Sequence, residues 1–135
     1  MFLERMLIYG LTMGVLMWFQ ACCGMTEKEI LLDCCDAWNC LLNEKFAPQW
    51  TATTDPCLDR WYGIVCSNQS VTQIHLNASD LTGSIPSSLG NLSNLHTLYL
   101  FENSLTGSIP HSNTHLTNKK ILNLYNTILA VTIKK

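Results

Sequence analysis

Two copies of one pattern stand next to each other in this chain: VTQIHLNASDLTGSIPSSLGNLSN (residues 71–94) and LHTLYLFENSLTGSIPHSNTHLTN (residues 95–118). The hexapeptide LTGSIP holds the same place in both copies, at 81–86 and at 105–110. Two unrelated hairpins would not reproduce six identical residues at a constant spacing. A period of 24 residues is typical of solenoids, in which each repeat buries its apolar side chains against its neighbours.

Each copy predicts one short strand. Ile74 alternates with Leu76, and Leu98 with Leu100, so each pair points to one side of an extended segment. Strands stacked at a fixed period form a parallel sheet. Asn103 follows its strand, where its amide can bond backbone groups as the chain turns.

The second half of each copy predicts a bend and a return to the core. Gly83 and Gly107 permit a tight bend. Pro86 and Pro110 end strand pairing and direct the chain outward. The leucines that then return toward the core are Leu89, Leu92 and Leu116.

A third copy begins at Lys119 and decays. Val131 replaces the glycine, and Lys134 replaces the proline. Its remaining apolar positions are Leu122, Leu124, Leu129 and Ile133.

The segment before the repeats predicts an amphipathic helix. Thr26 and Glu29 have the spacing of a capping box. Apolar residues follow with helical period until the pattern stops before Pro48: Ile30, Leu31, Cys34, Ala37, Trp38, Leu41 and Leu42. Between this helix and the repeats lies WTATTDPCLDRWYGIVC (residues 50–66), in which Cys57 and Cys66 are close enough to close a small loop.

The N-terminus carries an uncharged run from Met6 to Thr26. Its apolar middle and small-residue end predict a secretory signal, cut near Gly24. The run is also close to the ~20 residues that span a bilayer, so an uncleaved signal anchor is an alternative, and a buried core helix is a third. Either of the first two places the rest of the chain outside the cytosol.

Two further features indicate a secretory compartment. The chain contains seven cysteines, a density typical of oxidising compartments. It also contains three N-x-S/T sequons, and their acceptor asparagines are Asn68, Asn77 and Asn91.

The repeat resembles that of plant-type leucine-rich-repeat proteins, LxxLxxLxLxxNxLxGxIPxxLxx, and LTGSIPSSLGNLSNLHTLYL matches it closely. The preceding segment resembles the N-terminal cap of that family, with LLDCCDAW as its helix, then Trp50, and Asp55-Pro56-Cys57 leading to Trp61–Cys66. The resemblance covers roughly residues 27–118. It implies an α/β leucine-rich-repeat solenoid with a short parallel sheet and a helical cap clipped by a Cys57–Cys66 disulfide.

The expected organisation follows from that resemblance. Residues 1–24 are a signal peptide or anchor, 25–70 the cap, 71–94 and 95–118 the first two repeats, and 119–135 a degenerate or truncated third.

The chain departs from the pattern where Ser79 and Thr127 replace asparagine and Asn113 replaces leucine. Solenoids need about three repeats and an end cap, so the chain is expected to be a truncated or degenerating member. Without Cys22 and Cys23 an odd number of cysteines remains, and Cys34, Cys35 and Cys40 receive no predicted pairing.

The resemblance implies extracellular recognition of a protein, peptide or glycan by the exposed strand positions on the concave side. The candidate positions are Gln73, His75, Asn77, Thr97, Tyr99, Phe101 and Glu102. Tyr99 and Phe101 are the strongest anchors, because aromatics dominate interface energetics; the alternative is that they only cover the sheet. A glycan on Asn77 would obstruct this face. The other functional hypotheses are a membrane-anchored adaptor and the N-terminal part of a leucine-rich-repeat receptor kinase.

The sequence gives no reason to expect several classes of function. The net charge of −2 and the pI of about 6.0 provide no basic stripe for nucleic acid. GxSxG, HExxH, P-loop and kinase signatures do not occur, so no catalysis and no cofactor are expected. His111 and His115 have the spacing of paired metal ligands but no further ligand nearby, so no metal site is expected.

Overall fold

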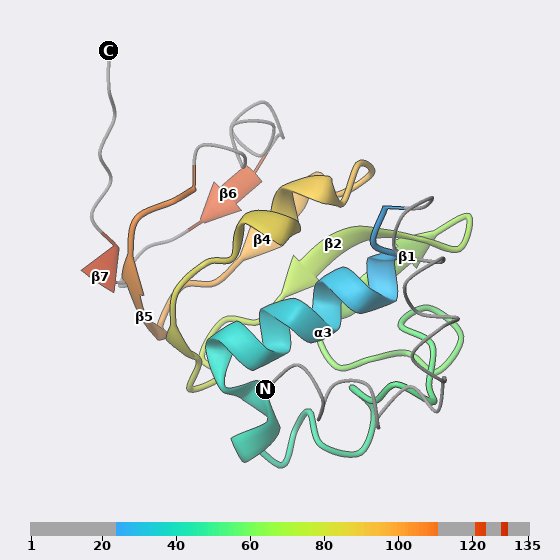
Figure 1. Ribbon diagram of the computed structural model, residues 1–135, viewed down its shortest axis with the longest axis horizontal. Helices are drawn as coiled ribbons and strands as arrows, with labels where there is room; N and C mark the ends of the chain where they lie inside the picture. Colours follow the sequence, from blue (N-terminus) through green and yellow to red (C-terminus); the bar gives the residue numbers. More distant parts are fainter. Residues whose placement is uncertain (1–23, 111–120, 124–127, 130–135) are drawn as a thin grey trace, which may run out of the picture.

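The computed structural model describes residues 24–110, 121–123 and 128–129. Its main sheet has the strand order β1-β2-β4-β6, formed by β1 (Ile64–Ser67), β2 (Ser70–His75), β4 (Thr97–Tyr99) and β6 (Ile121–Asn123) (Figure 1). The predicted signal or anchor segment lies outside the described residues. So do His111, His115 and Leu116, and most of the third copy.

The repeats stack in register. β2, β4 and β6 run parallel, and Ile74 pairs with Leu98, which in turn pairs with Leu122. Each step along the sheet is one 24-residue period. Ile74, Leu76 and Leu100 are fully buried, as their alternation predicts. β1 comes from the preceding segment and pairs antiparallel with β2, which adds a fourth strand.

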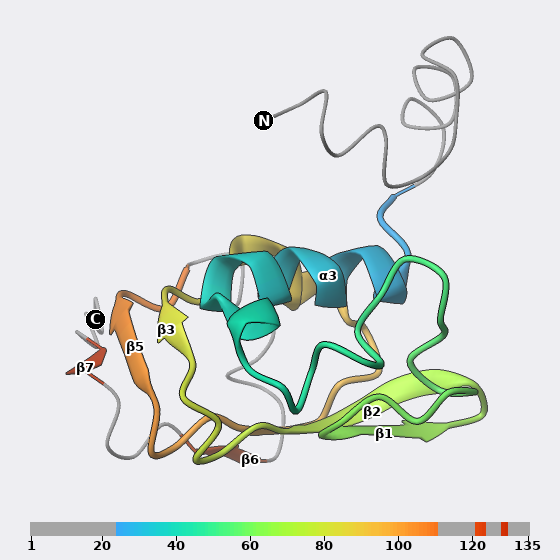
Figure 2. The same ribbon diagram turned by 90° about the horizontal axis from the view of Figure 1, so that it is seen from below.

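A second ladder, which the sequence did not predict, lies at one end of the molecule (Figure 2). It joins β3 (Thr82–Gly83), β5 (Ser104–Gly107) and β7 (Ile128–Leu129) in parallel. The LTG segments were expected only to bend. Because they recur at the same place in successive repeats, their backbones also pair: the Ser104 N–H donates to the Leu81 carbonyl at 2.8 Å.

Helix α3 (Glu27–Trp38) begins at the predicted capping box, since Thr26 Oγ1 accepts from the Glu29 N–H and the Glu29 carboxylate accepts from the Thr26 N–H. It lies against the sheet side that also carries the 3₁₀ turn η2 (Ser87–Asn91), as Figures 1 and 2 show. Its buried face, with Ile30, Leu31 and Trp38, follows the predicted period.

The helix ends earlier than its apolar pattern suggests. Asn39 takes the left-handed conformation (φ 53°), and the chain enters a second 3₁₀ turn, η1 (Cys40–Leu42). The expectation that Leu41 and Leu42 lie on the buried face is therefore wrong: they are 53% and 88% exposed.

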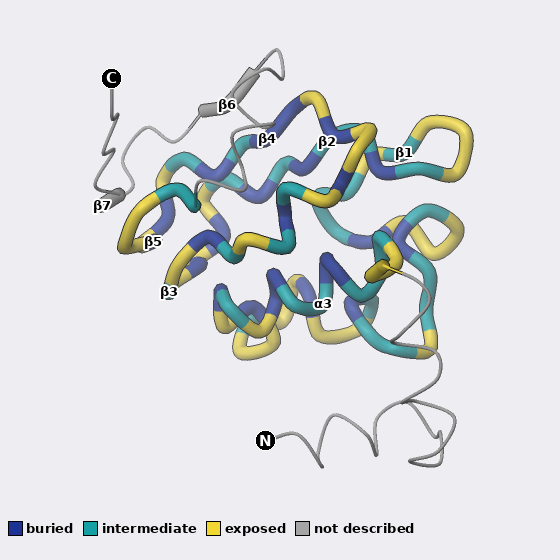
Figure 3. The backbone as a smooth tube through the Cα atoms, turned by 45° about the horizontal axis from the view of Figure 1, so that its top comes forward, coloured by how far each residue is buried: buried dark blue, intermediate teal, exposed yellow. Residues whose placement is uncertain are grey.

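The cap and the repeats share one hydrophobic core. Trp38, Trp50, Trp61 and Phe46 are fully buried from the cap side, and the repeat leucines join the same cluster. Figure 3 shows buried stretches on the facing sides of helix and strands, whereas exposed stretches gather in the connecting turns. A cap that shares the core closes the first repeat against water.

Two disulfides tie the cap together. Cys57 bonds to Cys66, which joins the loop before β1 to β1 itself. Cys35 bonds to Cys40, which joins the last turn of α3 to η1. Cys34 remains a free, buried thiol. Burial raises its pKa well above the ordinary range, and the neighbouring Asp33 adds to the effect, so Cys34 is an unreactive core residue.

The buried side chain of Asn103 holds the two repeats together. Asn103 is 7% exposed, and its Oδ1 accepts from the N–H groups of Ser79 and Leu81 at 3.1 and 3.0 Å. Its Nδ2 donates to the carbonyls of Leu76 and Leu100 at 2.7 and 2.9 Å. One amide thus bonds backbone groups of both repeats.

Gly83 lies where the C-terminal end of α3 crosses the second ladder. Its φ is +81°, and a β-carbon there would lie 2.0 Å from the Ala37 carbonyl oxygen. Gly107 holds the equivalent place in the next repeat with φ +87°, but among the described residues its β-carbon would meet only Ser84 Cβ, at 3.5 Å. Both glycines permit the predicted bend, and Gly83 also permits close packing of the cap on the first repeat.

A candidate recognition face on the sheet

The sheet presents one face to α3 and the opposite face away from it (Figure 2). Because side chains alternate along a strand, residues next to the buried Ile74, Leu76, Leu98 and Leu100 point to this opposite face. We call it the outward face; its members are Val65, Gln73, His75, Asn77, Thr97, Tyr99 and Phe101.

The register arranges the outward face in rows across the strands. Gln73 pairs with Thr97, and His75 pairs with Tyr99. The pairing continues past the end of β2, because the Leu76 N–H donates to the Tyr99 carbonyl at 2.9 Å and the Ala78 N–H donates to the Phe101 carbonyl at 3.1 Å. Asn77 and Phe101 therefore form a third row.

Three rings on this face contact one another and form an aromatic ladder of His75, Tyr99 and Phe101. The imidazole of His75 stacks on the Tyr99 ring with centroids 4.9 Å apart, and Phe101 meets Tyr99 edge to face at 6.1 Å. All three side chains are half-buried. His75 Nε2 is buried and has no hydrogen-bond partner among the described residues, so stacking rather than a bond at Nε2 fixes this ring.

The structure brings most of the sequence-predicted candidates together on the outward face: Gln73, His75, Asn77, Thr97, Tyr99 and Phe101. Thr97 lies there between Gln73 of β2 and Ile121 of β6 and is only 7% exposed, so its selection as an exposed contact residue is corrected. Glu102 is exposed in a turn after β4, with φ 57°.

Val65 is a member of this face that sequence reasoning missed. It pairs with Gln73 from β1 and is 39% exposed. β1 was not predicted as a strand, so its alternating positions were not assigned to a face. The IVC run after Gly63 was the available signal, because β-branched residues favour strands.

Charged side chains lie at the margins of the aromatic ladder. At one margin the Lys45 ammonium lies 5.9 Å from the Tyr62 ring centroid and donates to the Ala78 carbonyl at 3.3 Å. Glu102 supplies a carboxylate directly after Phe101. An arrangement of this kind can bind an apolar or aromatic side chain of a partner.

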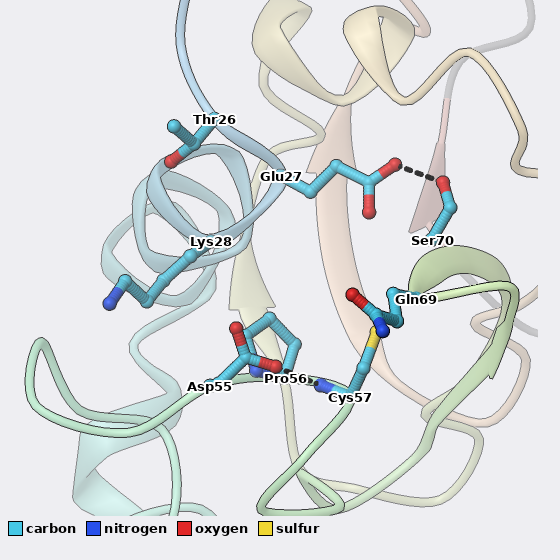
Figure 4. Close-up of a pocket in the computed structure, with 8 residues that line it drawn as sticks. All are labelled: Thr26, Glu27, Lys28, Asp55, Pro56, Cys57, Gln69 and Ser70. Atoms are coloured by element: carbon cyan, nitrogen blue, oxygen red, sulfur yellow. Dashed lines mark hydrogen bonds between the residues drawn. The ribbon is translucent and has the colours of Figure 1, made fainter.

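A pocket of about 380 Å³ lies elsewhere, between the start of α3, the Cys57 loop and the β1–β2 turn (Figure 4). The Glu27 carboxylate points to Ser70, whose hydroxyl donates to it at 2.6 Å, and it also accepts from the Val71 N–H at 2.8 Å. The Asp55 carboxylate accepts from the Leu58 and Cys57 N–H groups at 2.9 Å each, and these bonds hold its pKa below the ordinary value. Glu27 thus joins the start of α3 to β2, and Asp55 holds its own turn, so both carboxylates already have structural partners.

Within residues 24–110, 121–123 and 128–129, no group of three or more His, Cys, Asp or Glu side chains is placed to hold a metal ion. No helix in the same residues is long and apolar enough to cross a bilayer.

No family model matches the chain. Individual relatives do. The chain is 33% identical over 76 residues to the leucine-rich repeat protein FLOR 1 of Arabidopsis thaliana, which covers 56% of this chain and 22% of that protein. It is 41% identical over 56 residues to Pollen receptor-like kinase 3 of the same plant, which covers 40% of this chain and 9% of the kinase. The chain thus spans less than a quarter of these relatives, and the match to the kinase is confined to a short segment.

Solved structures agree with the sequence relatives. The crystal structure of a Pollen Receptor Kinase 3 superposes with a TM-score of 0.53 at 36% identity, covering 61% of this chain and 40% of that one. The Arabidopsis receptor kinase HAESA, solved with the peptide hormone IDA and the co-receptor SERK1, superposes with a TM-score of 0.59 at 24% identity, covering 77% and 17%. The resemblance in the sequence is therefore confirmed: the relatives are plant leucine-rich-repeat receptor-like kinases and leucine-rich-repeat proteins, and the fold is that of plant leucine-rich-repeat ectodomains.

Proposed function

We propose that this chain is an extracellular recognition module whose outward face binds a peptide or an extended segment of a protein. The observation that carries the proposal is the aromatic ladder of His75, Tyr99 and Phe101. Aromatic side chains supply large contact areas with few rotatable bonds, and they are enriched among residues that dominate binding energy.

The position of the ladder supports an extended ligand. His75 and Tyr99 share one row of the sheet, Phe101 lies in the next row, and Val65 and Gln73 form the row before them. An extended segment that lies along the strand direction would therefore contact several rows at once. A peptide partner is also the class named for HAESA, whose ectodomain has the same fold.

The setting supports a location outside the cytosol. Four cysteines form disulfides, and such bonds persist in oxidising compartments. The secreted and the membrane-anchored forms of this function differ in the fate of the first 24 residues. N-terminal sequencing of protein collected from the medium separates the two: a new N-terminus near Gly24 supports secretion, and retention of Met1 in a membrane fraction supports the anchored adaptor.

A binding selection tests the proposed face. Random peptides displayed on phage are selected against the folded chain, and enriched peptides are synthesised and measured by calorimetry. We expect Tyr99→Ala to weaken their binding by tenfold or more, about 1.4 kcal/mol, as for an anchor residue. Leu58→Ala is the matched control, because Leu58 is 76% exposed in the cap loop outside the sheet.

Two results would count against the face. One is a selection that enriches no peptide above background. The other is a set of peptides that bind Tyr99→Ala and Phe101→Ala as tightly as the original chain, since their contacts then lie elsewhere.

A further inference from the structure

The seven asparagines of residues 24–110 divide into two groups by what their side-chain amides do. Four donate a hydrogen bond through Nδ2: Asn39 to Thr82 at 2.8 Å, Asn43 to the Ser79 carbonyl at 3.1 Å, Asn94 to Ser70 at 2.8 Å, and Asn103 to several carbonyls. The other three are the sequon asparagines Asn68, Asn77 and Asn91. None of these three makes a side-chain hydrogen bond within the described part of the chain.

This division matters because N-glycosylation replaces one hydrogen of Nδ2 with a sugar. Asn103, whose Nδ2 donates to the Leu76 and Leu100 carbonyls, would lose one of these bonds on modification. The three sequon asparagines have no such bond to lose, so a glycan on them removes no side-chain hydrogen bond of the described fold.

The three positions differ in what a glycan would cover. Asn68 lies at the exposed tip of the β1–β2 hairpin, where Asn68 and Gln69 both have positive φ, 50° and 60°. Asn91 is exposed at the end of η2, on the side of the sheet that carries α3. Asn77 is half-buried on the outward face itself, in the row of Phe101.

We propose that Asn77 is an N-glycosylation site and that its glycan covers the Phe101 end of the outward face. The flanking residues fix the direction of this side chain. Leu76 and Ser79 are fully buried, and the Ser79 hydroxyl donates to the Asn77 carbonyl at 3.0 Å. Asn77 is held between them with its amide directed away from the core.

The modification is a group transfer from a lipid-pyrophosphate-linked oligosaccharide. A bond forms between Asn77 Nδ2 and C1 of the first sugar, and the bond from C1 to the pyrophosphate oxygen breaks. The lipid pyrophosphate leaves, Nδ2 gives up one proton, and no oxidation occurs. Ser79, the hydroxyl residue of this sequon, is 0% exposed after folding, so the transfer precedes folding of this repeat.

The consequence for recognition rests on the proposed function. A glycan on Asn77 leaves His75 and Tyr99 open and reduces access to Phe101. Occupancy of one sequon would then set the length of ligand that the face accepts.

The experiment uses the full chain expressed in a eukaryotic secretory host, without any ligand. Glycopeptide mass spectrometry reads the occupancy of each sequon, and hydroxyl-radical footprinting reads the exposure of Tyr99 and Phe101. The variants are Asn77→Gln, with Asn68→Gln and Asn91→Gln as matched controls. The original protein, trimmed to one sugar per site by an endoglycosidase after folding, provides a second route that needs no substitution.

We expect Asn77 to be occupied. Because an N-linked glycan is bulky and solvated, oxidation of Phe101 should rise about twofold or more in Asn77→Gln and in the trimmed protein, with Leu58 unchanged and no rise in either control variant. A translocated chain with Asn77 unmodified would overturn the site. Occupied Asn77 with equal Phe101 oxidation in all samples would overturn the covering. Neither result touches the peptide-binding proposal, which the phage selection tests separately.

Discussion

Replacing Gly83 with alanine probes how the cap is joined to the first repeat. The added methyl would lie 2.0 Å from the Ala37 carbonyl oxygen and 3.2 Å from its carbon. Both atoms belong to the backbone of α3, so no side-chain rotation relieves the overlap. The end of the helix must move away from β3, and the bond from Asn39 Nδ2 to Thr82 Oγ1 is strained or lost.

The structure supplies a matched control in Gly107, which has nearly the same backbone conformation (φ +87° against +81°) but, in the described part of the chain, no backbone atom close to an added β-carbon. Alanine at either site must adopt the left-handed conformation, which costs about 1–2 kcal/mol of folding free energy. Gly83→Ala adds overpacking of about 1–3 kcal/mol and about 1 kcal/mol for the hydrogen bond. We expect Gly107→Ala to lower the free energy of unfolding by about 1–2 kcal/mol and Gly83→Ala by about 3–6 kcal/mol.

Urea unfolding followed by tryptophan fluorescence measures the difference, since Trp38, Trp50 and Trp61 are all at most 1% exposed in the core. The comparison holds if the urea dependence of the unfolding free energy is the same in both variants. Equal losses at Gly83 and Gly107 would contradict the close contact between Gly83 and α3, because they would leave only the backbone conformation as the cause. A larger loss at Gly107 would show that the cap does not pack on the first repeat as described.

Three further outcomes follow from the same structure. Asn103→Ala removes both acceptor and donor bonds between repeats and should lower the free energy of unfolding by about 3–5 kcal/mol, whereas Asn94→Ala, which loses one exposed bond, should lower it by about 1 kcal/mol or less; similar values in denaturant titrations would contradict the bridging role. Non-reducing peptide mapping should find Cys57 linked to Cys66, and the double serine variant should lose about 2–3 kcal/mol of stability; two free thiols would refute the pairing. Cys34 should resist iodoacetamide in the native protein and react on unfolding, because burial raises its pKa; native alkylation at neutral pH would contradict its burial.

Much of the fold could be predicted because the apolar pattern recurs at a constant period. The alternation of Ile74 with Leu76, repeated 24 residues later, fixes both the buried side of each strand and the parallel register. Asn103 was assigned to the backbone of the turn from its place after the strand, and the structure shows that role. The capping box at Thr26 is a local pattern and needed no tertiary information.

The features that sequence reasoning missed depend on contacts between distant segments. The second ladder arises because the Leu-Thr-Gly segments of successive repeats lie side by side, and nothing within one such segment marks it as a strand. The end of α3 at Trp38 depends on the left-handed Asn39 and on the Cys35–Cys40 bond, whereas Leu41 and Leu42 continue the apolar pattern. The burial of Thr97 likewise comes from strands on both sides of it.

The candidate face was predicted only in part, because its assembly also depends on contacts between distant segments. Tyr99 and Phe101 follow from the alternation of their strand, and His75 from that of its neighbour. Predicting that the three rings contact one another would have required the register between the repeats. Predicting that Val65 lies on the same face would have required the antiparallel pairing of β1 with β2.

The most direct test of the recognition face is a nuclear magnetic resonance titration of the folded chain with a peptide from the phage selection. Ring resonances of His75, Tyr99 and Phe101 report on the outward face, and resonances of Leu41, Leu42 and Leu58 report on exposed apolar positions of the cap. We expect the ring resonances of His75 and Tyr99 to shift on binding, and those of Phe101 to shift when Asn77 carries no glycan. Shifts confined to the cap leucines, with the three rings unchanged at saturation, would show that the peptide does not bind the outward face.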